Sequence, residues 1–418
     1  MKNVPNLRFK EFSEELEYKK LGEIVDYKKG YAFKSNNYCD SGTRIIKISD
    51  TSSNSIKDDD ITCISDEKAV DYKEWQLQED DIIVSTVGSR PPLYSSMVGK
   101  IILVPKRYQD SLLNQNLVRL RTNELSTQRY LYCCLNRKRY IKHIEGICRG
   151  NANQVSITLE DLFDYQLRLP SLVEQEKIAS FLSLIDKKIE LQTEKVEELK
   201  NYKKGIMQKI FSQELRFKDE NGNEYPEWKI GRLGEYLSNK GGTALEKYVE
   251  DEGTHNFISI GNYSVDGNYI DTGQRINLND KTQEKLLNKN DLVMVLNDKT
   301  ASGDLIGSTI LIDEDNKYIY NQRSERLICN SAISPDFCWV LLNSKMFRKK
   351  VFSIAQGGTQ IYVNFSSVKN LEIEFPHLKE QEKIAHFIFN LNTKLNKEQE
   401  KLDMLLTYKK GLLQQMFI

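Results

Sequence analysis

The sequence lacks most of the features that would place a protein in a membrane, in an oxidising compartment or around a metal ion. No apolar run approaches the roughly 20 residues that span a bilayer, and charged residues at Lys2 and Arg8 interrupt any apolar leader. The seven cysteines are odd in number and show no Cys-x-x-Cys spacing, and the four histidines are scattered. We therefore expect a cytoplasmic protein with reduced thiols and without zinc or another bound metal.

The chain also lacks the signatures of common enzyme classes. It contains no Gly-x-x-x-x-Gly-Lys-Ser/Thr phosphate loop and no His-Glu-x-x-His motif. The run Arg90–Tyr94 resembles the Asn-Pro-Pro-aromatic motif of amino-group methyltransferases only superficially, because arginine stands where the amide belongs. Acidic-x-Lys triplets such as Asp71–Lys73 are expected by chance in a chain with 29% charged residues. We therefore predict a non-catalytic chain that binds no cofactor itself.

A net charge is absent as well, since 60 basic and 60 acidic residues cancel. No global positive field marks a nucleic-acid binder, so any such contact must come from local patches. With 418 residues and 39% apolar content, the chain has the composition of a globular protein with two large domains.

An internal repeat is the dominant feature of the sequence. Residues 171–211 align with residues 377–417 at a shift of 206, with 18 identities in 41 positions, where chance gives about two or three. The preceding parts repeat more faintly and in the same order: Leu7–Phe9 recurs as Leu215–Phe217, and Asn114–Gln115 recurs as Asn321–Gln322. The chain is therefore two copies of one unit, each a globular domain followed by a long helix.

Both repeated segments carry the heptad pattern of a coiled coil, with eight of ten a and d positions apolar and the polar layers at the same two places. The predicted seam consists of Ile178, Leu182, Ile185, Ile189, Val196, Leu199, Ile206, Ile210, Ile384, Ile388, Leu391, Leu395, Leu402, Leu405, Leu412 and Met416. One isolated helix cannot bury such a stripe, so we predict that the two helices pair antiparallel within the chain. A coiled coil between two chains is the alternative. Outside the seam, Phe181, Leu184 and Phe387 are expected to face outward and to need a binding partner.

The domain organisation follows from this repeat. We predict domain 1 at residues 1–169, a first helix at 170–214, domain 2 at 215–375 and a second helix at 376–418. About forty residues at 1.5 Å each make a helix of roughly 60 Å. Short β-rich runs, turn clusters and helical patches at about 128–144 and 337–355 give each domain a mixed character. The fold class is α+β with a pseudo-two-fold internal repeat.

Several loops combine the residue types that contact DNA. The loops 149–154 and 356–360 hold glycine, which allows close approach, and amide side chains, which read base edges. The loops 89–94 and 297–302 occupy equivalent positions but differ in sequence, which favours different targets. Lysines and aromatic residues alternate near Tyr31, a pattern typical of nucleic-acid contact, although tyrosines more often cover a core.

The candidate DNA-contacting residues of the first half are Lys28, Lys29, Tyr31, Lys34, Ser89, Arg90, Tyr94, Arg149, Asn151, Asn153 and Gln154. Those of the second half are Lys240, Thr243, Asn297, Lys299, Thr300, Ser302, Gly357, Gly358, Thr359, Gln360 and Tyr362.

Together these motifs resemble a known family. The two-copy layout, the Gly-Gly-Thr-Gln loop at 357–360, the proline before each helix, the Glu-Gln-Glu-Lys-Ile-Ala helix start and the Tyr-Lys-Lys-Gly motif near its end are similar to the specificity subunit of Type I restriction-modification systems. The resemblance covers nearly the whole chain and is strongest in the helices. The loop at 149–154 departs from the Gly-Gly-Thr-Gln form.

The resemblance implies a division of labour. Two target-recognition domains each read half of a split double-stranded DNA site, and the helices act as spacer and as docking surface for two methyltransferase subunits, which restriction subunits then join. S-adenosylmethionine, ATP and magnesium belong to those partner chains. Two alternatives stay open: a coiled-coil scaffold whose domains bind proteins rather than DNA, and a degenerate methyltransferase.

Overall fold

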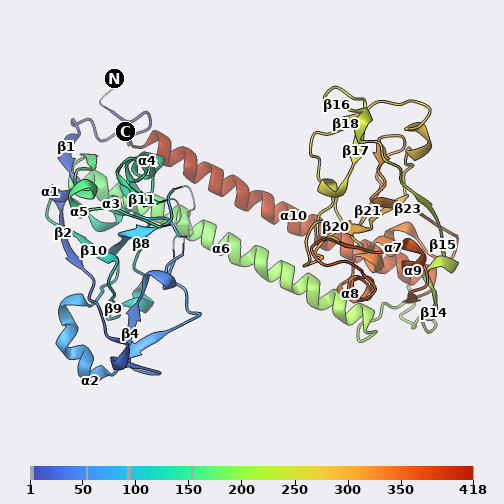
Figure 1. Ribbon diagram of the computed structural model, residues 1–418, viewed down its shortest axis with the longest axis horizontal. Helices are drawn as coiled ribbons and strands as arrows, with labels where there is room; N and C mark the ends of the chain where they lie inside the picture. The colour runs from blue at the N-terminus through green and yellow to red at the C-terminus, as the bar shows by residue number, and fades with distance from the viewer. Residues whose placement is uncertain (1–3, 53–54, 92–95, 152–153, 418) are drawn as a thin grey trace. The chain divides into compact units, whose positions relative to one another are not determined.

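The computed structural model describes residues 4–52, 55–91, 96–151 and 154–417, and it divides into two compact units (Figure 1). Unit 1 comprises Met1–Thr193 and Lys401–Ile418, and unit 2 comprises Glu194–Glu400. Each unit therefore contains one globular part and a piece of each long helix. The domain boundaries predicted from the sequence follow a different division and stay a prediction.

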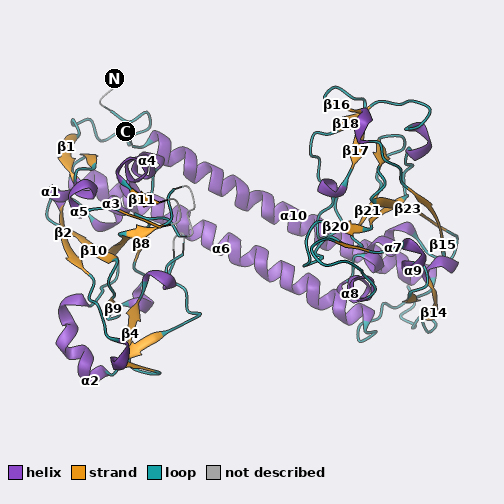
Figure 2. Cartoon of the chain, viewed as in Figure 1, coloured by secondary structure: helices purple, strands orange, loops and turns teal. Residues whose placement is uncertain are grey.

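The globular part of unit 1 is built from short strands and helices (Figure 2). Its strands are β1 (Glu17–Lys20), β2 (Val25–Lys29), β3 (Tyr38–Cys39), β4 (Thr43–Ile46), β5 (Thr62–Ile64), β6 (Ile82–Ser85), β7 (Val87–Gly88), β8 (Ile101–Leu103), β9 (Leu112–Leu113), β10 (Leu117–Thr122), β11 (Arg149–Asn151), β12 (Gln154–Ser156) and β13 (Gln166–Leu169). Its helices are α1 (Leu21–Ile24), α2 (Asp66–Ala69), α3 (Gln128–Leu135), α4 (Lys138–Ile147) and α5 (Leu159–Phe163).

The globular part of unit 2 repeats this order. Its strands are β14 (Lys229–Arg232), β15 (Leu237–Gly241), β16 (Val249–Glu250), β17 (His255–Ile258), β18 (Arg275–Ile276), β19 (Leu292–Val295), β20 (Asn297–Asp298), β21 (Thr309–Leu311), β22 (Tyr318–Tyr320), β23 (Ser324–Cys329), β24 (Ile361–Tyr362) and β25 (Glu372–Phe375). Its helices are α7 (Pro335–Leu342), α8 (Lys345–Ser353) and α9 (Phe365–Val368), and the long helices are α6 (Leu172–Phe211) and α10 (Leu378–Gln415).

The four-stranded sheets of the two units correspond strand by strand. A four-stranded sheet runs β2-β10-β6-β8 in unit 1 and β15-β23-β19-β21 in unit 2, and a second runs β3-β5-β4-β9 and β16-β18-β17-β22. Each second sheet contains one parallel pair, β4 with β9 and β17 with β22. The repeat inferred from the sequence is thus a repeat of architecture, and the α+β prediction is confirmed.

The central strand of each main sheet is buried on both faces, because its alternating side chains enter two different cores. In β6, Ile82 and Val84 pack with α3 and α4, whereas Ile83 packs in a separate cluster with Tyr108 and Leu113. In β19 the corresponding alternation separates Leu292 and Met294 from Val293 and Val295. This central strand leads in each unit directly into a predicted DNA-contacting loop.

Each helical patch predicted from the sequence is two helices rather than one. The first divides into α3 and α4 around Asn136, and the second into α7 and α8 around Asn343. The second break has a local cause, because the Ser344 hydroxyl accepts a hydrogen bond of 3.2 Å from the Phe347 N–H and caps a new helix.

The helix pairing predicted from the heptad pattern is confirmed. All sixteen seam residues are buried or half-buried. In unit 1 the beginning of α6, with Ile178 and Leu182, packs with the end of α10, with Leu412 and Met416. In unit 2 the end of α6, at Ile210, packs with the beginning of α10. The two helices are therefore antiparallel in both units.

Two side chains that the sequence suggested would point outward are covered instead. Phe181 packs edge to face on Phe9 at a centroid distance of 5.9 Å, and Phe387 packs on Phe217 at 5.7 Å. The segments around Phe9 and Phe217 fold back over the helices and leave both rings half-buried. Of the three aromatic and apolar residues expected to face outward, Leu184 is the exposed one, at 68%.

Candidate nucleic-acid interface

Each unit brings its two predicted DNA-contacting loops together through a small antiparallel strand pair. In unit 1, β7 pairs with β12 so that Gly88 faces Val155. In unit 2, β20 pairs with β24 so that Asp298 faces Ile361. Loops far apart in the sequence therefore lie beside each other on equivalent edges, and each unit forms one composite surface rather than two separate loops.

The glycine of the amide-containing loop has a structural function in both units. Gly150 has φ +117° and Gly357 has φ +107°, a backbone region that residues with a side chain rarely occupy. A Cβ atom at Gly357 would lie 2.1 Å from the Gln360 carbonyl oxygen. The turn accordingly requires glycine here, whereas Gly358 has open space around it.

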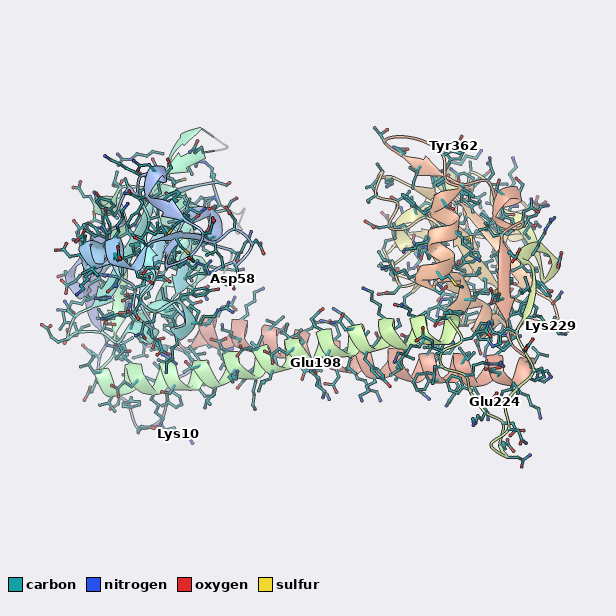
Figure 3. The ribbon with its side chains drawn as sticks, turned by 90° about the horizontal axis from the view of Figure 1, so that it is seen from below. Lys10, Asp58, Glu198, Glu224, Lys229 and Tyr362 are labelled. Atoms are coloured by element: carbon teal, nitrogen blue, oxygen red, sulfur yellow. The ribbon has the colours of Figure 1, made fainter. Side chains whose placement is uncertain are left out.

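The polar side chains of this loop in unit 2 are exposed. Thr359, Gln360 and Tyr362 all reach solvent, and the Tyr362 hydroxyl donates a 3.1 Å hydrogen bond to the Gln356 side-chain oxygen. Figure 3 shows Tyr362 at the end of unit 2 that lies away from α6 and α10. An outward tyrosine and amides beside a glycine turn form a surface suited to base and phosphate contact.

In unit 1 the same segment is the β-hairpin β11–β12 rather than an irregular loop. Arg149 is mostly exposed and donates a 2.7 Å hydrogen bond to the Asp161 carboxylate, and Gln154 is exposed. Asn151 belongs to β11, opposite Gln154. In the neighbouring loop, the Ser89 and Ser96 hydroxyls lie 2.8 Å apart and Arg90 is exposed. Tyr94 and Asn153 lie outside the described residues.

Asp298 organises the corresponding loop of unit 2. Its carboxylate accepts hydrogen bonds from the Thr300 N–H and hydroxyl, each at 2.9 Å, and from the Leu305 N–H at 2.7 Å. Burial alone raises the pKa of Asp298, but these hydrogen bonds outweigh it and lower the pKa, so the carboxylate is charged near neutral pH. The Thr300 and Ser302 hydroxyl oxygens are hydrogen-bonded at 2.9 Å, and the Lys299 side chain is exposed.

The lysine and aromatic patch around Tyr31 is partly engaged within the protein. Lys28 forms an ion pair with Glu74 and lies 4.7 Å over the Trp75 ring. Tyr31 packs on Phe33, Tyr72 and Trp75 with centroid distances of 4.8–5.0 Å. Tyr31 therefore covers a core flank, while Lys29 and Lys34 are exposed, as are Lys240 and Thr243 in unit 2.

One element at the centre of this surface was not among the sequence candidates. The turns Asn114–Asn116 and Asn321–Arg323 each lie between the Tyr31 or Thr243 segment and the loop pair, joined by backbone hydrogen bonds to both sides. The signal that could have found them is the Asn-Gln identity that the two copies share at these positions.

Across the part of the chain that the structure describes, no group of three or more His, Cys, Asp or Glu side chains is placed to hold a metal ion. Within the same residues, no helix is both long and apolar enough to cross a membrane.

Comparisons with known proteins agree with this arrangement. A family model described as "Type I restriction modification DNA specificity domain" matches residues 13–201 and again residues 225–405. A specificity subunit of the Type I restriction enzyme MjaVIII from Methanocaldococcus jannaschii is 27% identical over 346 residues, which cover 79% of this chain and 77% of the relative. The two matched stretches correspond to the two copies of the repeat.

Solved structures share the fold. The S subunit of a Type I restriction-modification system from M. genitalium superimposes with a TM-score of 0.63 at 16% identity and covers 99% of both chains. A chain from a structure of complex assembly and conformational transition of the type I R-M system superimposes with a TM-score of 0.55 at 15% identity, over 96% of this chain and 97% of that one.

Proposed function

Because the chain belongs to the family of Type I restriction modification DNA specificity domains, we propose that each of its two units reads one half of a split DNA site. As a family member, the chain is a non-catalytic specificity subunit, the component of such a system that recognises DNA. The observation that carries the proposal is the composite loop surface, which is built in the same way in both units by β7–β12 and β20–β24.

The composition of the two surfaces supports contact with a duplex. Exposed cations such as Arg90, Arg149 and Lys299 suit phosphate oxygens, and Gln154, Thr359 and Gln360 suit base edges. The loops at 89–96 and 297–305 share a position but not a sequence. Each unit therefore reads a different half-site, and the complete target is an asymmetric, interrupted sequence.

The paired helices serve as spacer and docking surface in this proposal. Apolar and aromatic side chains remain exposed on the helix faces away from the seam, at Leu184, Leu191, Tyr202, Met404 and Tyr408. Exposed apolar patches of this kind mark protein interfaces. Two methyltransferase subunits cover these faces, and restriction subunits join them.

All chemistry belongs to the partner chains. S-adenosylmethionine, ATP and magnesium bind to the methyltransferase and restriction subunits, and the complete assembly acts in the cytoplasm. The specificity subunit contributes target choice and geometry.

The test is coexpression of the chain with a methyltransferase subunit from the same genome, followed by sequencing of methylated bases in the host DNA. The expected result is a new motif with two defined halves and a constant gap. A stable complex that modifies no new motif would contradict DNA reading and favour a scaffold that binds proteins. Binding of S-adenosylmethionine by the isolated chain would favour a degenerate methyltransferase.

A further inference from the structure

We propose that the turns Asn114–Asn116 and Asn321–Arg323 are a second reading element, in which Gln115 and Gln322 contact bases in their respective half-sites. The inference rests on the proposed DNA-reading function and adds specificity residues to it. Four observations support it: the position of the turns, their rigid anchoring, the exposure of the glutamines, and the differences between the two units around a shared residue.

The turns occupy the middle of the composite surface in both units. In unit 1, the Gln115 N–H donates to the Tyr31 carbonyl at 2.9 Å on one side, and the Thr86 N–H donates to the Asn116 carbonyl at 2.9 Å on the other. The Ile157 N–H in turn donates to the Thr86 carbonyl at 3.0 Å and connects the β11–β12 hairpin. The turn is thus continuous with both regions that the sequence had already singled out.

Unit 2 reproduces the connections to the loop pair, and on the other side Gly242 bonds as Gly30 does in unit 1, where the Gly30 N–H donates to the Leu117 carbonyl at 2.9 Å. The Gly242 N–H donates to the Ser324 carbonyl at 3.0 Å, and the Leu296 N–H donates to the Arg323 carbonyl at 2.9 Å. The Val363 N–H donates to the Leu296 carbonyl at 2.9 Å and connects β24. A DNA duplex that contacts the loops on either side of the turn must therefore pass over the turn itself.

Each turn is anchored by a buried asparagine and a close glycine. The Asn114 side-chain oxygen accepts from the Gln115 N–H at 2.6 Å, and that of Asn321 accepts from the Arg323 N–H at 3.1 Å. A Cβ atom at Gly30 or Gly242 would lie 1.9 or 1.8 Å from the backbone oxygen of the facing asparagine. The backbone of the turn is consequently packed too closely to move as an ordinary surface loop does.

On this rigid base, Gln115 and Gln322 are exposed. A glutamine amide donates and accepts at once, so it can bind the N6 and N7 atoms of adenine as a pair. Fixing the turn in advance lowers the entropy lost when such a contact forms. The geometry therefore suits base reading better than it suits a purely structural turn, in which the buried asparagine alone would suffice.

The neighbours of the two glutamines differ in charge. Glu246 in unit 2 accepts a 3.0 Å hydrogen bond from the Asn321 amide and also interacts with the Gln322 side chain. Lys34 occupies the corresponding place in unit 1, four residues after the close glycine in each case. Asn116 is likewise replaced by Arg323, whose guanidinium suits guanine or phosphate. Because the same glutamine has different neighbours in the two units, we expect the two half-sites to be related but not identical in sequence.

The experiment uses the full chain with its methyltransferase partner and sequences methylated bases in host DNA. Gln115→Ala should relax the preference at one base of one half-site by on the order of 10-fold and leave the other half-site unchanged, and Gln322→Ala should do the reverse. Gln109→Ala, an exposed glutamine at the opposite end of β9, is the control for Gln115. Arg323→Ala should weaken the reading of the second half-site in the same way, and Lys317→Ala, at the opposite end of β22, is its control.

The isosteric variants Gln115→Glu and Gln322→Glu guard against misfolding, since they keep the shape of the side chain and should change the preferred base. A wild-type chain that yields no split motif would refute the proposed function itself. A clear wild-type motif that every glutamine variant leaves intact would overturn this inference alone. An equal loss of methylation at all bases of both half-sites would assign the turns a packing role and overturn it as well.

Discussion

At the residue scale, one buried carboxylate in each unit ties the beginning of a long helix to the start of the predicted domain. Arg8 donates two hydrogen bonds of 2.7 Å to Glu174, and Arg216 donates bonds of 3.2 and 2.7 Å to Glu380. Both glutamates are almost completely buried. A bidentate arginine–carboxylate pair fixes the orientation of both side chains. If one member is removed, the other is left as a buried charge without a partner.

Replacement of Arg216 with methionine should therefore lower the free energy of unfolding by about 3–5 kcal/mol. The double variant Arg216→Met/Glu380→Leu should recover most of this loss, because both charges are removed together. Urea unfolding measures the difference. Arg275→Met, which breaks the solvent-screened pair with Asp271, serves as control and should cost much less stability. Equal losses in both single variants would contradict the argument from burial.

Lys100 is a buried cation with a pH-dependent cost. Its ammonium donates to the Thr51 carbonyl at 3.0 Å, and burial lowers its pKa to about 8. Between this value and about 10.5 the unfolded chain binds more protons than the folded chain, so stability gains from this residue as the pH rises through that window. Below pH 8 the full penalty remains.

The free energy of unfolding of the wild type, relative to Lys100→Met, should accordingly rise between pH 7.5 and pH 9.5. Urea unfolding at several pH values measures this difference, and Lys10→Met, at an exposed lysine, provides the comparison. A constant difference between wild type and Lys100→Met across this range would show that the ammonium is not the titrating group.

At the element scale, the polar layers of the helix pair are not equivalent in the two units. In unit 1, Lys409 pairs with Asp186 at 2.5 Å. The shift of 206 residues places Lys203 and Asn392 at the corresponding positions of unit 2. Lys203 is half-buried, and burial lowers its pKa. One layer thus joins opposite charges across the helix pair, while in the other the repeat places the neutral Asn392 opposite Lys203, and the nearby opposite charge comes from Asp266.

Asn392→Asp should add a carboxylate at the position that corresponds to Asp186 and raise the free energy of unfolding by about 0.5–1 kcal/mol, and it should raise the pKa of Lys203. Asp186→Asn, the mirror-image change, should lower the stability by a similar amount. Urea unfolding together with NMR titration of the lysine side chain measures both effects. Destabilisation by Asn392→Asp would show that these two side chains do not meet.

At the scale of the whole molecule, the proposed function requires the paired helices to fix the distance between the two DNA-reading parts. If two readers are held by a rigid spacer, simultaneous binding is possible only at one separation, and the gain in effective concentration is lost at others. In unit 2, Lys195 and Glu398 form a 3.1 Å ion pair, which identifies the facing heptads of α6 and α10.

Removal of the facing heptads Gln192–Glu198 and Asn396–Leu402 keeps the seam in register and shortens each helix by about 10 Å. The gap in the methylated motif should then shorten by about three base pairs, or methylation should stop if the readers no longer meet the same face of the duplex. Sequencing of methylated bases distinguishes these results. Removal of the α6 heptad alone should abolish methylation, since it misaligns the seam. An unchanged gap with full methylation would contradict the spacer role.

The sequence by itself determined the repeat, the two long helices and their pairing. These features depend on local periodicity, because a heptad stripe must be buried and a duplicated chain contains both strands of the pair. The glycine and amide loops were also visible in the sequence, since a residue with a side chain rarely takes the positive φ of Gly150 and Gly357. The contacts of the candidate residues with DNA stay predictions.

Only the tertiary structure decided which of these parts lie together. Strand pairing between residues more than sixty positions apart joins the two loops in each unit, and no local pattern encodes such a pairing. The same reason explains why the Asn114 and Asn321 turns were overlooked, and why Phe181 and Phe387 were expected to face outward although Phe9 and Phe217 cover them. Side-chain burial depends on distant segments, and these are placed by the packing of the whole core.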